Sequence, residues 1–197
     1  MGKRRRHEEE TDPEITLYAL VGSPSPGTMR VKGRVNSVPL VILVDFGSTH
    51  NFIDAVVVPV LHMPVDESQV LEVKVANGDI IQTQGLCKDV QVCVQGQTFL
   101  VQLHVLPLGG CDVVFGTQWL STLGVINWDF MNLSMEFKYG QQQVKLQGLN
   151  TSKGLEVQNE VQFFKESTRK GGQITADSTA EQQPALPPEI TALLQEF

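Results

Sequence analysis

Residues 41–53 read Val-Ile-Leu-Val-Asp-Phe-Gly-Ser-Thr-His-Asn-Phe-Ile, and this stretch decides the fold. It continues Val38–Val44, a nearly unbroken apolar run that predicts a strand buried on both faces. The run ends on a carboxylate, Asp45, and Gly47 follows two residues later. A glycine there lets the backbone turn sharply, so that its N–H can reach the carboxylate. Ser48 and Thr49 can orient that carboxylate further.

An isolated Asp-x-Gly pattern is common by chance. Such an aspartate can simply cap a helix, here the one expected from about Asn51. The rest of the fragment, a long apolar strand before Asp45 and a polar turn after it, favours a functional carboxylate instead.

Outside this stretch, short β-rich runs continue from Thr28 to about Gly148, separated by Gly, Asn, Asp or Pro. Asn77-Gly78-Asp79 and Gln95-Gly96-Gln97 each separate two such runs, which predicts two hairpins. The expected strands are Met29–Val35, Val38–Val44, Val70–Ala76, Ile80–Gln84, Val90–Val94, Thr98–Val105, Asp112–Phe115, Val125–Trp128, Ser134–Phe137 and Gln143–Leu146.

Two short helices are expected between these strands. One runs from about Asn51 to Val58 and is stopped by Pro59, and the other runs from about Gln118 to Leu123 and ends at Gly124. Short strands at this spacing predict an all-β sandwich or barrel with one or two short helices.

Composition divides the chain into four parts. Residues 1–27 form a charged tail and linker, and residues 28–148 form the folded domain. Residues 149–186, rich in Ser, Thr, Gly and Gln towards their end, are expected to be a flexible, disordered linker. Residues 187–197 open on Pro-Pro-Glu-Ile and predict a short amphipathic helix at the start of a truncated downstream region.

Bulk properties limit the function classes. A net charge of -7 argues against a nucleic-acid-binding fold, and the longest apolar run is too short to cross a membrane. The three cysteines have no Cys-x-x-Cys spacing, and His50, His62 and His104 lack ligand spacing, so we expect no metal and no other cofactor. An odd cysteine count without an apolar leader favours an intracellular, cytoplasmic location, with the nucleus as an alternative.

The stretch from Asp45 to Ile53 resembles the active-site loop of aspartic proteases in plant gypsy-type LTR retrotransposons, a retropepsin-like family. Eight positions match the family pattern, at Asp45 and at 47–53. Gly110–Gly116, followed by Trp119-Leu120, Leu123-Gly124 and Trp128-Asp129, resembles a second block of the family. Val75–Gly78 falls where the family carries the flap hairpin that closes over substrate. The resemblance covers roughly residues 15–150 and implies a closed acid-protease barrel.

This resemblance implies the site residues. Asp45 is the catalytic group, and the catalytic loop is completed by Phe46, Gly47, Ser48 and Thr49. The flap is carried by Ala76, Asn77, Gly78 and Asp79. The strand that supports the loop contains Val113, Val114, Phe115 and Gly116. The end of the chain resembles the run leading into a reverse transcriptase, so we expect part of a gag-pol polyprotein.

Peptide hydrolysis by carboxylates needs two of them, sharing one proton across one water. The sequence has a single Asp-x-Gly element, and Asp112 precedes its apolar run instead of following it. We therefore expect a homodimer with one Asp45 from each copy, acting on an extended peptide from a polyprotein. Phe46 departs from the family, which has Ser or Thr there to lock the two loops together, and this loss could cost a few kcal/mol.

Three other interpretations were weighed. Asp45-Phe46-Gly47 spells a kinase metal-binding tripeptide, but the chain has no glycine-rich loop and no His-Arg-Asp element. A degenerate protease fold acting as a dimerisation or interaction module is favoured by Phe46 and stays open. Nucleic-acid binding by the basic run at residues 3–6 is disfavoured, because acidic residues follow it at once.

Overall fold

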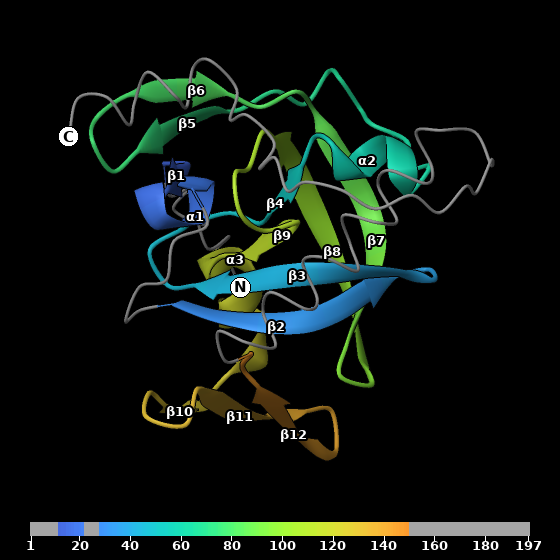
Figure 1. Cartoon of the computed structure of the whole chain (residues 1–197), viewed down its shortest axis with the longest axis vertical. Coiled ribbons are helices and arrows are strands. Elements are labelled where there is room, and N and C mark those ends of the chain that lie inside the picture. Colours follow the sequence, from blue (N-terminus) through green and yellow to red (C-terminus); the bar gives the residue numbers. More distant parts are fainter. Residues whose placement is uncertain (1–11, 22–27, 150–197) are drawn as a thin grey trace, which may run out of the picture.

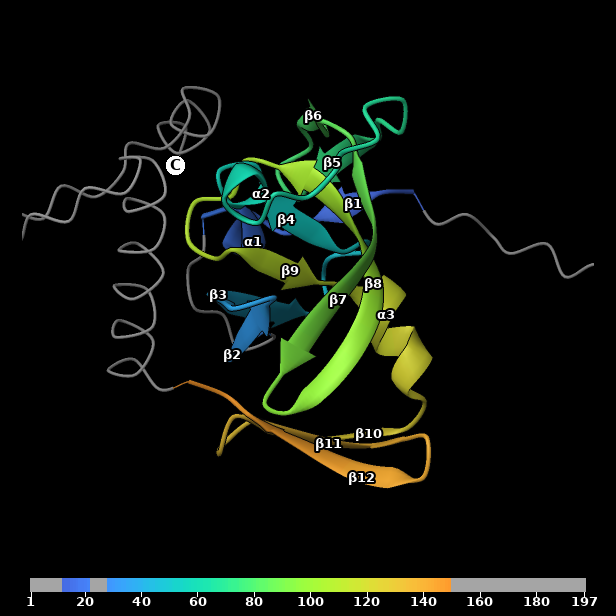
Figure 2. The ribbon, with the colours of Figure 1, turned by 90° about the vertical axis from the view of Figure 1, so that its right-hand side faces the viewer.

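The computed structural model describes residues 12–21 and 28–149, and its centre is a closed barrel of six strands (Figures 1 and 2). The order around the barrel is β2 (Thr28–Val35), β3 (Val38–Asp45), β9 (Val113–Phe115), β4 (Phe52–Asp54), β8 (Gln97–Leu106) and β7 (Leu86–Val94), which pairs with β2 again. The prediction of an all-β barrel with a few short helices is confirmed.

Strand β3 is buried on both faces, as its apolar run predicts. Ile42 and Val44 point into the barrel core, whereas Val41 and Leu43 belong to a second apolar cluster outside it. Successive side chains of a strand point to opposite faces, so one continuous apolar run fills two cores. Asp45 therefore lies at the end of a strand buried on both faces, next to β9 on one side and β2 on the other.

The helix predicted from about Asn51 to Val58 is wrong in its first half. Phe52–Asp54 forms strand β4, which pairs with both β9 and β8, and Phe52 and Ile53 are fully buried there. Only Val57–Val60 is helical (α2), and Pro59 lies within it. Proline is tolerated in a first helical turn because the N–H groups of that turn have no partner within the helix. Burial between two strands outweighs the local helical pattern.

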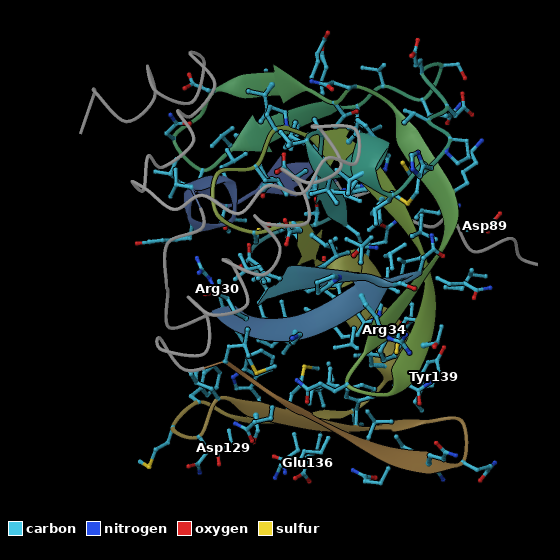
Figure 3. All side chains as sticks on the ribbon, turned by 45° about the vertical axis from the view of Figure 1, so that its right-hand side comes forward. Arg30, Arg34, Asp89, Asp129, Glu136 and Tyr139 are labelled. Atoms are coloured by element: carbon cyan, nitrogen blue, oxygen red, sulfur yellow. The ribbon has the colours of Figure 1, made fainter. Side chains whose placement is uncertain are left out.

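A smaller sheet covers one end of the barrel. After β9 come α3 (Thr117–Leu120), a 3-10 turn (Ser121–Leu123), β10 (Ile126–Asp129), β11 (Ser134–Tyr139) and β12 (Gln142–Gln147). Met135 and Phe137 of β11 join the barrel core, while Asp129 and Glu136 lie on the other side (Figure 3). Gly124 has φ 72°, as expected of a residue that ends a helix.

The predicted Asn77-Gly78-Asp79 hairpin is present as β5 (Glu72–Val75) and β6 (Ile80–Gln82). The second hairpin is present as β7 and β8. Strand β1 (Glu14–Ile15) and helix α1 (Leu17–Val21) pack beside the first hairpin. In both views they lie between β5 and β3 (Figures 1 and 2). Ile15, Ala19 and Leu20 are almost completely buried.

These packed residues fall within the stretch that composition assigns to tail and linker, so the packed unit reaches further towards the N-terminus than Thr28. The division into four parts otherwise stays a prediction, because most of the tail, the linker beyond Leu149 and the helix at 187–197 lie outside the described residues. None of the helices described is both long and apolar enough to cross a bilayer.

Candidate active site

Asp45 is 2% exposed, and its carboxylate is bonded on both oxygens. The Gly47 N–H donates to Oδ1 at 3.1 Å, and the Ser48 hydroxyl donates to Oδ2 at 2.6 Å. These are the two interactions that the Asp-x-Gly-Ser pattern predicts: a turn that brings a backbone N–H back to the carboxylate, and a hydroxyl that orients it. Together the two donors fix the orientation of the carboxylate.

Residues 45–50, the Asp45 loop, are held from one side by a group that we call the loop support: Asn51 and residues 116–118. The N–H groups of Thr117 and Gln118 donate to the carbonyl oxygens of Ser48 and Thr49 at 2.8 and 2.9 Å. The first N–H groups of a helix have no partner within it, so the start of α3 binds the loop at no cost to its own hydrogen bonding.

Asn51 and Gly116 complete the loop support. The buried Asn51 side chain accepts from the Gly116 N–H and donates to the carbonyl of Gln102. A Cβ on Gly116 would lie 2.3 Å from the His50 carbonyl oxygen and 2.5 Å from that of Ser48. Only glycine lets the chain pass this close to the loop backbone. Asn51 stands inside the stretch that decides the fold, but no role could be assigned to it without the topology.

Val113, Val114 and Phe115 form β9, which lies between β3 and β4. Leu43 and Phe52, on either side of the Asp45 loop in sequence, both pair with Val114. The predicted supporting strand thus lies directly beneath the loop. Asp112 precedes β9, and its carboxylate accepts the Val41 N–H at 2.7 Å. It is buried and ties β9 to β3 at a distance from the Asp45 carboxylate along that strand.

The opposite side of the loop is covered by residues 13–16, which we call the loop cover. The Thr16 hydroxyl donates to Asp45 Oδ2 at 2.7 Å. The Thr49 N–H donates to the Glu14 carbonyl at 2.9 Å, and the Glu14 N–H donates to the Thr49 hydroxyl at 2.7 Å. Sequence reasoning missed Thr16. The available signal was a threonine directly before the apolar run Leu17–Val21, which is a helix N-cap pattern.

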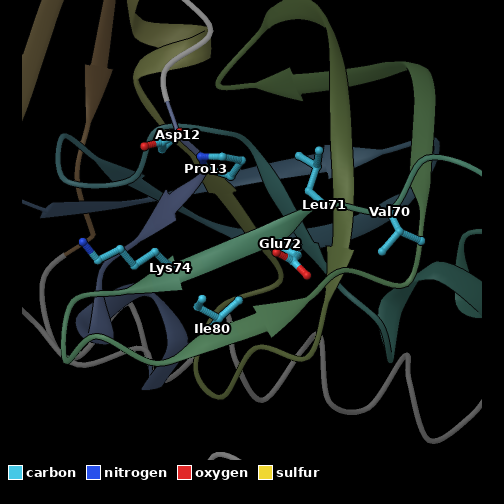
Figure 4. Close-up of a pocket in the computed structure, with 7 residues that line it drawn as sticks. All are labelled: Asp12, Pro13, Val70, Leu71, Glu72, Lys74 and Ile80. Carbon is cyan, nitrogen blue, oxygen red and sulfur yellow. The ribbon is translucent and has the colours of Figure 1, made fainter.

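The predicted flap residues Ala76, Asn77, Gly78 and Asp79 form the turn of the β5–β6 hairpin. Gly78 has φ 99°, and the Asn77 side chain bonds the N–H and the carboxylate of Asp79. The loop cover joins this hairpin to the Asp45 loop, because the Lys74 N–H of β5 donates to the Pro13 carbonyl at 2.8 Å. A hollow of about 470 Å³ lies where Asp12 and Pro13 meet Glu72, Lys74 and Ile80 (Figure 4), and Asp45 does not line it.

Phe46 faces outward and is 41% exposed. Its ring packs against Trp128 of β10, with centroids 4.7 Å apart, and Trp128 in turn contacts Phe130 at 5.6 Å. Phe46 therefore has an aromatic partner within its own chain. Gly47 beside it is exposed as well. Phe46, Trp128 and Phe130 form an aromatic patch next to the Asp45 loop.

Two histidines lie close together, His50 at the end of the loop and His104 of β8. The rings of His50 and His104 are 5.6 Å apart, and His104 is buried with its Nδ1 atom lacking a hydrogen-bond partner. Burial, together with the nearby His50, lowers the pKa of His104 to about 4, and burial also lowers the pKa of His50. Among the described residues, no three His, Cys, Asp or Glu side chains are grouped to hold a metal ion.

Comparison with known proteins gives a family and structural neighbours. A model of the family described as retroviral aspartyl protease matches residues 23–142. Among solved structures, the retroviral protease-like domain of Ddi1 from Leishmania major is similar at 12% identity and a TM-score of 0.47, over 62% of this chain and 94% of that chain. No curated protein matches the sequence.

Proposed function

The chain belongs to the retroviral aspartyl protease family, and from this premise we propose that it is an aspartic endopeptidase that works as a homodimer. The observation that carries the proposal is the Asp45 carboxylate at the end of β3, with Gly47 and Ser48 donating to it. This is a fixed acid group on a rigid strand. Fixed geometry is what a general acid or base requires.

Peptide hydrolysis of this kind needs two carboxylates, and Asp45 supplies one of them. In a pair about 3 Å apart, like charges prevent both groups from ionising, so one proton is shared. The ionised partner takes a proton from a water as that water attacks the peptide carbonyl, and the protonated partner donates to the carbonyl oxygen. The single Asp-x-Gly element of the sequence supplies one member of this pair, and a second copy of the chain would supply the other.

The surface beside Asp45 supports association. Phe46 and Phe130 are 41% and 61% exposed, and β10 is an edge strand of its sheet. Val125 and Met131, on either side of β10 in sequence, are each 91% exposed. An unpaired strand edge flanked by exposed apolar side chains is typical of a pairing surface. We propose that two copies meet here, with the two Asp45 loops facing each other.

The substrate would be an extended peptide between the Asp45 loop and the β5–β6 hairpin, whose turn at 76–79 would act as a flap. The resemblance to plant gypsy-type elements suggests that this peptide belongs to a gag-pol polyprotein. The three described cysteines are free thiols, which supports an intracellular setting as part of the proposal.

The test uses the full chain of 197 residues, incubated with a peptide library at about pH 5 to 6, because a carboxylate pair works with one shared proton. Cleavage by the wild type that is lost in Asp45→Asn supports an aspartic endopeptidase. Sedimentation of the same samples reports the oligomeric state, and a monomer at all concentrations would leave the dyad without its second carboxylate. Cleavage that is unchanged in Asp45→Asn would refute the assignment.

A second candidate is a catalytically degenerate module that dimerises or binds partners without cleaving them. Phe46 favours it, because a phenyl ring cannot make the inter-loop hydrogen bond expected of Ser or Thr at that position. Phe46→Ser separates the two candidates. Cleavage that appears only in this variant means that the fold can support catalysis and that Phe46 prevents it in the wild type. No cleavage in either form favours the binding module.

A further inference from the structure

We propose that residues 13–16 are a removable cover that occupies the peptide-binding site and competes with extended peptides for the Asp45 loop. The inference rests on the proposed function for the identity of the site, and it adds a means of regulation from within the chain. Its basis is the position of these residues between the loop and the β5–β6 hairpin (Figures 1 and 2).

The loop cover binds as a peptide strand would. Its main chain is bonded on two sides: Glu14 pairs with Thr49 of the loop, and the Pro13 carbonyl accepts from Lys74 of β5. Glu14 and Ile15 run parallel to Lys74 and Val75. Main-chain bonding of this kind tolerates many sequences, because it uses groups that every residue carries. The site can therefore accept another extended segment when the cover leaves.

At Thr16 the cover blocks the carboxylate. The Thr16 hydroxyl and the Ser48 hydroxyl both donate to Asp45 Oδ2, which occupies both lone pairs of that oxygen. A Cβ on Gly47 would lie 2.3 Å from the Thr16 methyl carbon, so the cover approaches the loop as closely as a glycine allows. A water or a peptide carbonyl would need the place that Thr16 takes.

The cover is built as an inhibitor and not as a substrate. The chain stops being extended at Thr16, because α1 begins at Leu17. The Thr16 carbonyl accepts the Leu20 N–H, and the Thr16 hydroxyl accepts the Ala19 N–H as the helix cap. The peptide group beside Asp45 is thus bonded within the helix, turned from the extended form that a protease cleaves. One side chain caps the helix and covers the carboxylate.

Of residues 13–16 only Ile15 has a buried side chain, which makes release of this segment feasible. Ile15 is buried in the outer apolar cluster, with Val73 and Val75 of β5, while Glu14 and Tyr18 are exposed. The Glu14–Lys74 ion pair is solvent-exposed at 3.9 Å and adds little. Changing Ile15 therefore removes the apolar anchor within residues 13–16, while Ala19 and Leu20 of α1 stay packed behind it.

The experiment uses the full chain with Ile15→Glu, which places a charge where Ile15 is buried and expels the cover. Thr16→Val keeps the shape and removes the hydroxyl, and Tyr18→Glu adds a charge at an exposed position of the same segment as the matched control. Hydrogen exchange is followed at the Thr49 and Lys74 amides, which donate to the cover, and at the amides of β2 and β3.

In Ile15→Glu we expect protection at Thr49 and Lys74 to fall at least about tenfold, while β2 and β3 stay as in the wild type, because the cover opens without the barrel. Thr16→Val should show a smaller fall at the same two amides, and Tyr18→Glu none. Loss of protection in the barrel as well, in both Ile15→Glu and Thr16→Val, would mean that residues 13–16 are an integral part of the core and would overturn the proposal.

Competition is measured with a labelled synthetic peptide of residues 12–21. It should bind Ile15→Glu at least about tenfold more tightly than the wild type, because a covered site is available only in its open fraction. Equal binding to both proteins would overturn the cover. Peptide cleavage, measured in parallel, should rise by a similar factor in Ile15→Glu. Release and peptide binding without cleavage in any variant would refute the endopeptidase and leave the cover standing.

Discussion

The loop support and the loop cover contact opposite sides of the Asp45 loop, residues 45–50, and they do so through different kinds of contacts. The support consists of Asn51 and residues 116–118 at the start of α3, which contact the loop backbone at close distances. The cover consists of residues 13–16, bonded through its own main chain and one hydroxyl. Breaking the support would open the barrel, whereas the proposed release of the cover would leave the barrel closed. Contacts that position a carboxylate and contacts that block it are therefore separable by mutation.

The largest effect is expected at Gly116. In Gly116→Ala the new methyl group meets two carbonyl oxygens that belong to rigid backbone, so we expect a loss of more than about 3 kcal/mol of unfolding free energy. Urea denaturation measures it. Gly140→Ala is the control, since Gly140 has φ 60° with open space around it and should cost about 1 kcal/mol. Equal losses would show that the support is no tighter than an exposed turn.

Asn51→Leu tests the polar half of the support. It leaves the Gly116 N–H and the Gln102 carbonyl without their side-chain partner in a buried place, and we expect a cost of about 2 to 3 kcal/mol. Asn77→Ala is the matched control, because Asn77 also makes two side-chain bonds but in an exposed turn. Its cost in the same denaturation experiment should stay below about 1 kcal/mol. A similar cost for both would remove the distinction between buried support and exposed turn.

His104 makes the support sensitive to acid. Its pKa is about 4 in the folded chain against 6.5 for an ordinary histidine, so between these values the unfolded chain binds a proton that the folded chain does not. Stability therefore falls as the pH falls from 6.5 to 4, by about 2 kcal/mol from this group. His50 is the titratable neighbour that adds to the effect.

Denaturation at pH 7 and at pH 4.5 should show a smaller loss in His104→Leu than in the wild type. His62→Asn, at an exposed position with φ 52°, should keep the full loss. If His104→Leu lost as much stability as the wild type, the pH dependence would belong to other groups.

Much of this arrangement could be predicted from sequence, for identifiable reasons. Hydrophobic patterning located β3, and glycine-containing turns located both hairpins, because burial on both faces and positive φ at Gly78 and Gly96 leave clear local signals. Hydrophobic patterning failed at β4, for which it predicted a helix. Phe52 and Ile53 are strand residues only because β9 and β8 flank them.

The cover could not be predicted in the same way. Ile15 and Thr16 take their meaning from contacts with residues about 30 to 60 positions away, and composition alone assigned them to a tail and linker. The same holds for the aromatic pairing of Phe46 with Trp128. Sequence reasoning treated Phe46 only as the loss of a hydroxyl, whereas the structure gives its ring a contact in the same chain.

The smallest effect is expected at Phe46, which lies on neither the support nor the cover. Phe46→Ser removes a half-exposed ring contact with Trp128, so the folded chain should lose about 1 kcal/mol of stability. The new hydroxyl is free to bond across to a second copy, so association should strengthen although each copy is less stable. Sedimentation equilibrium and urea denaturation of the same variant measure the two quantities. Phe46→Leu, apolar but without hydroxyl or aromatic ring, should lose comparable stability and gain no association. If Phe46→Ser weakened both, the apolar ring of Phe46 would contribute more to the pairing surface than a hydroxyl at that position can.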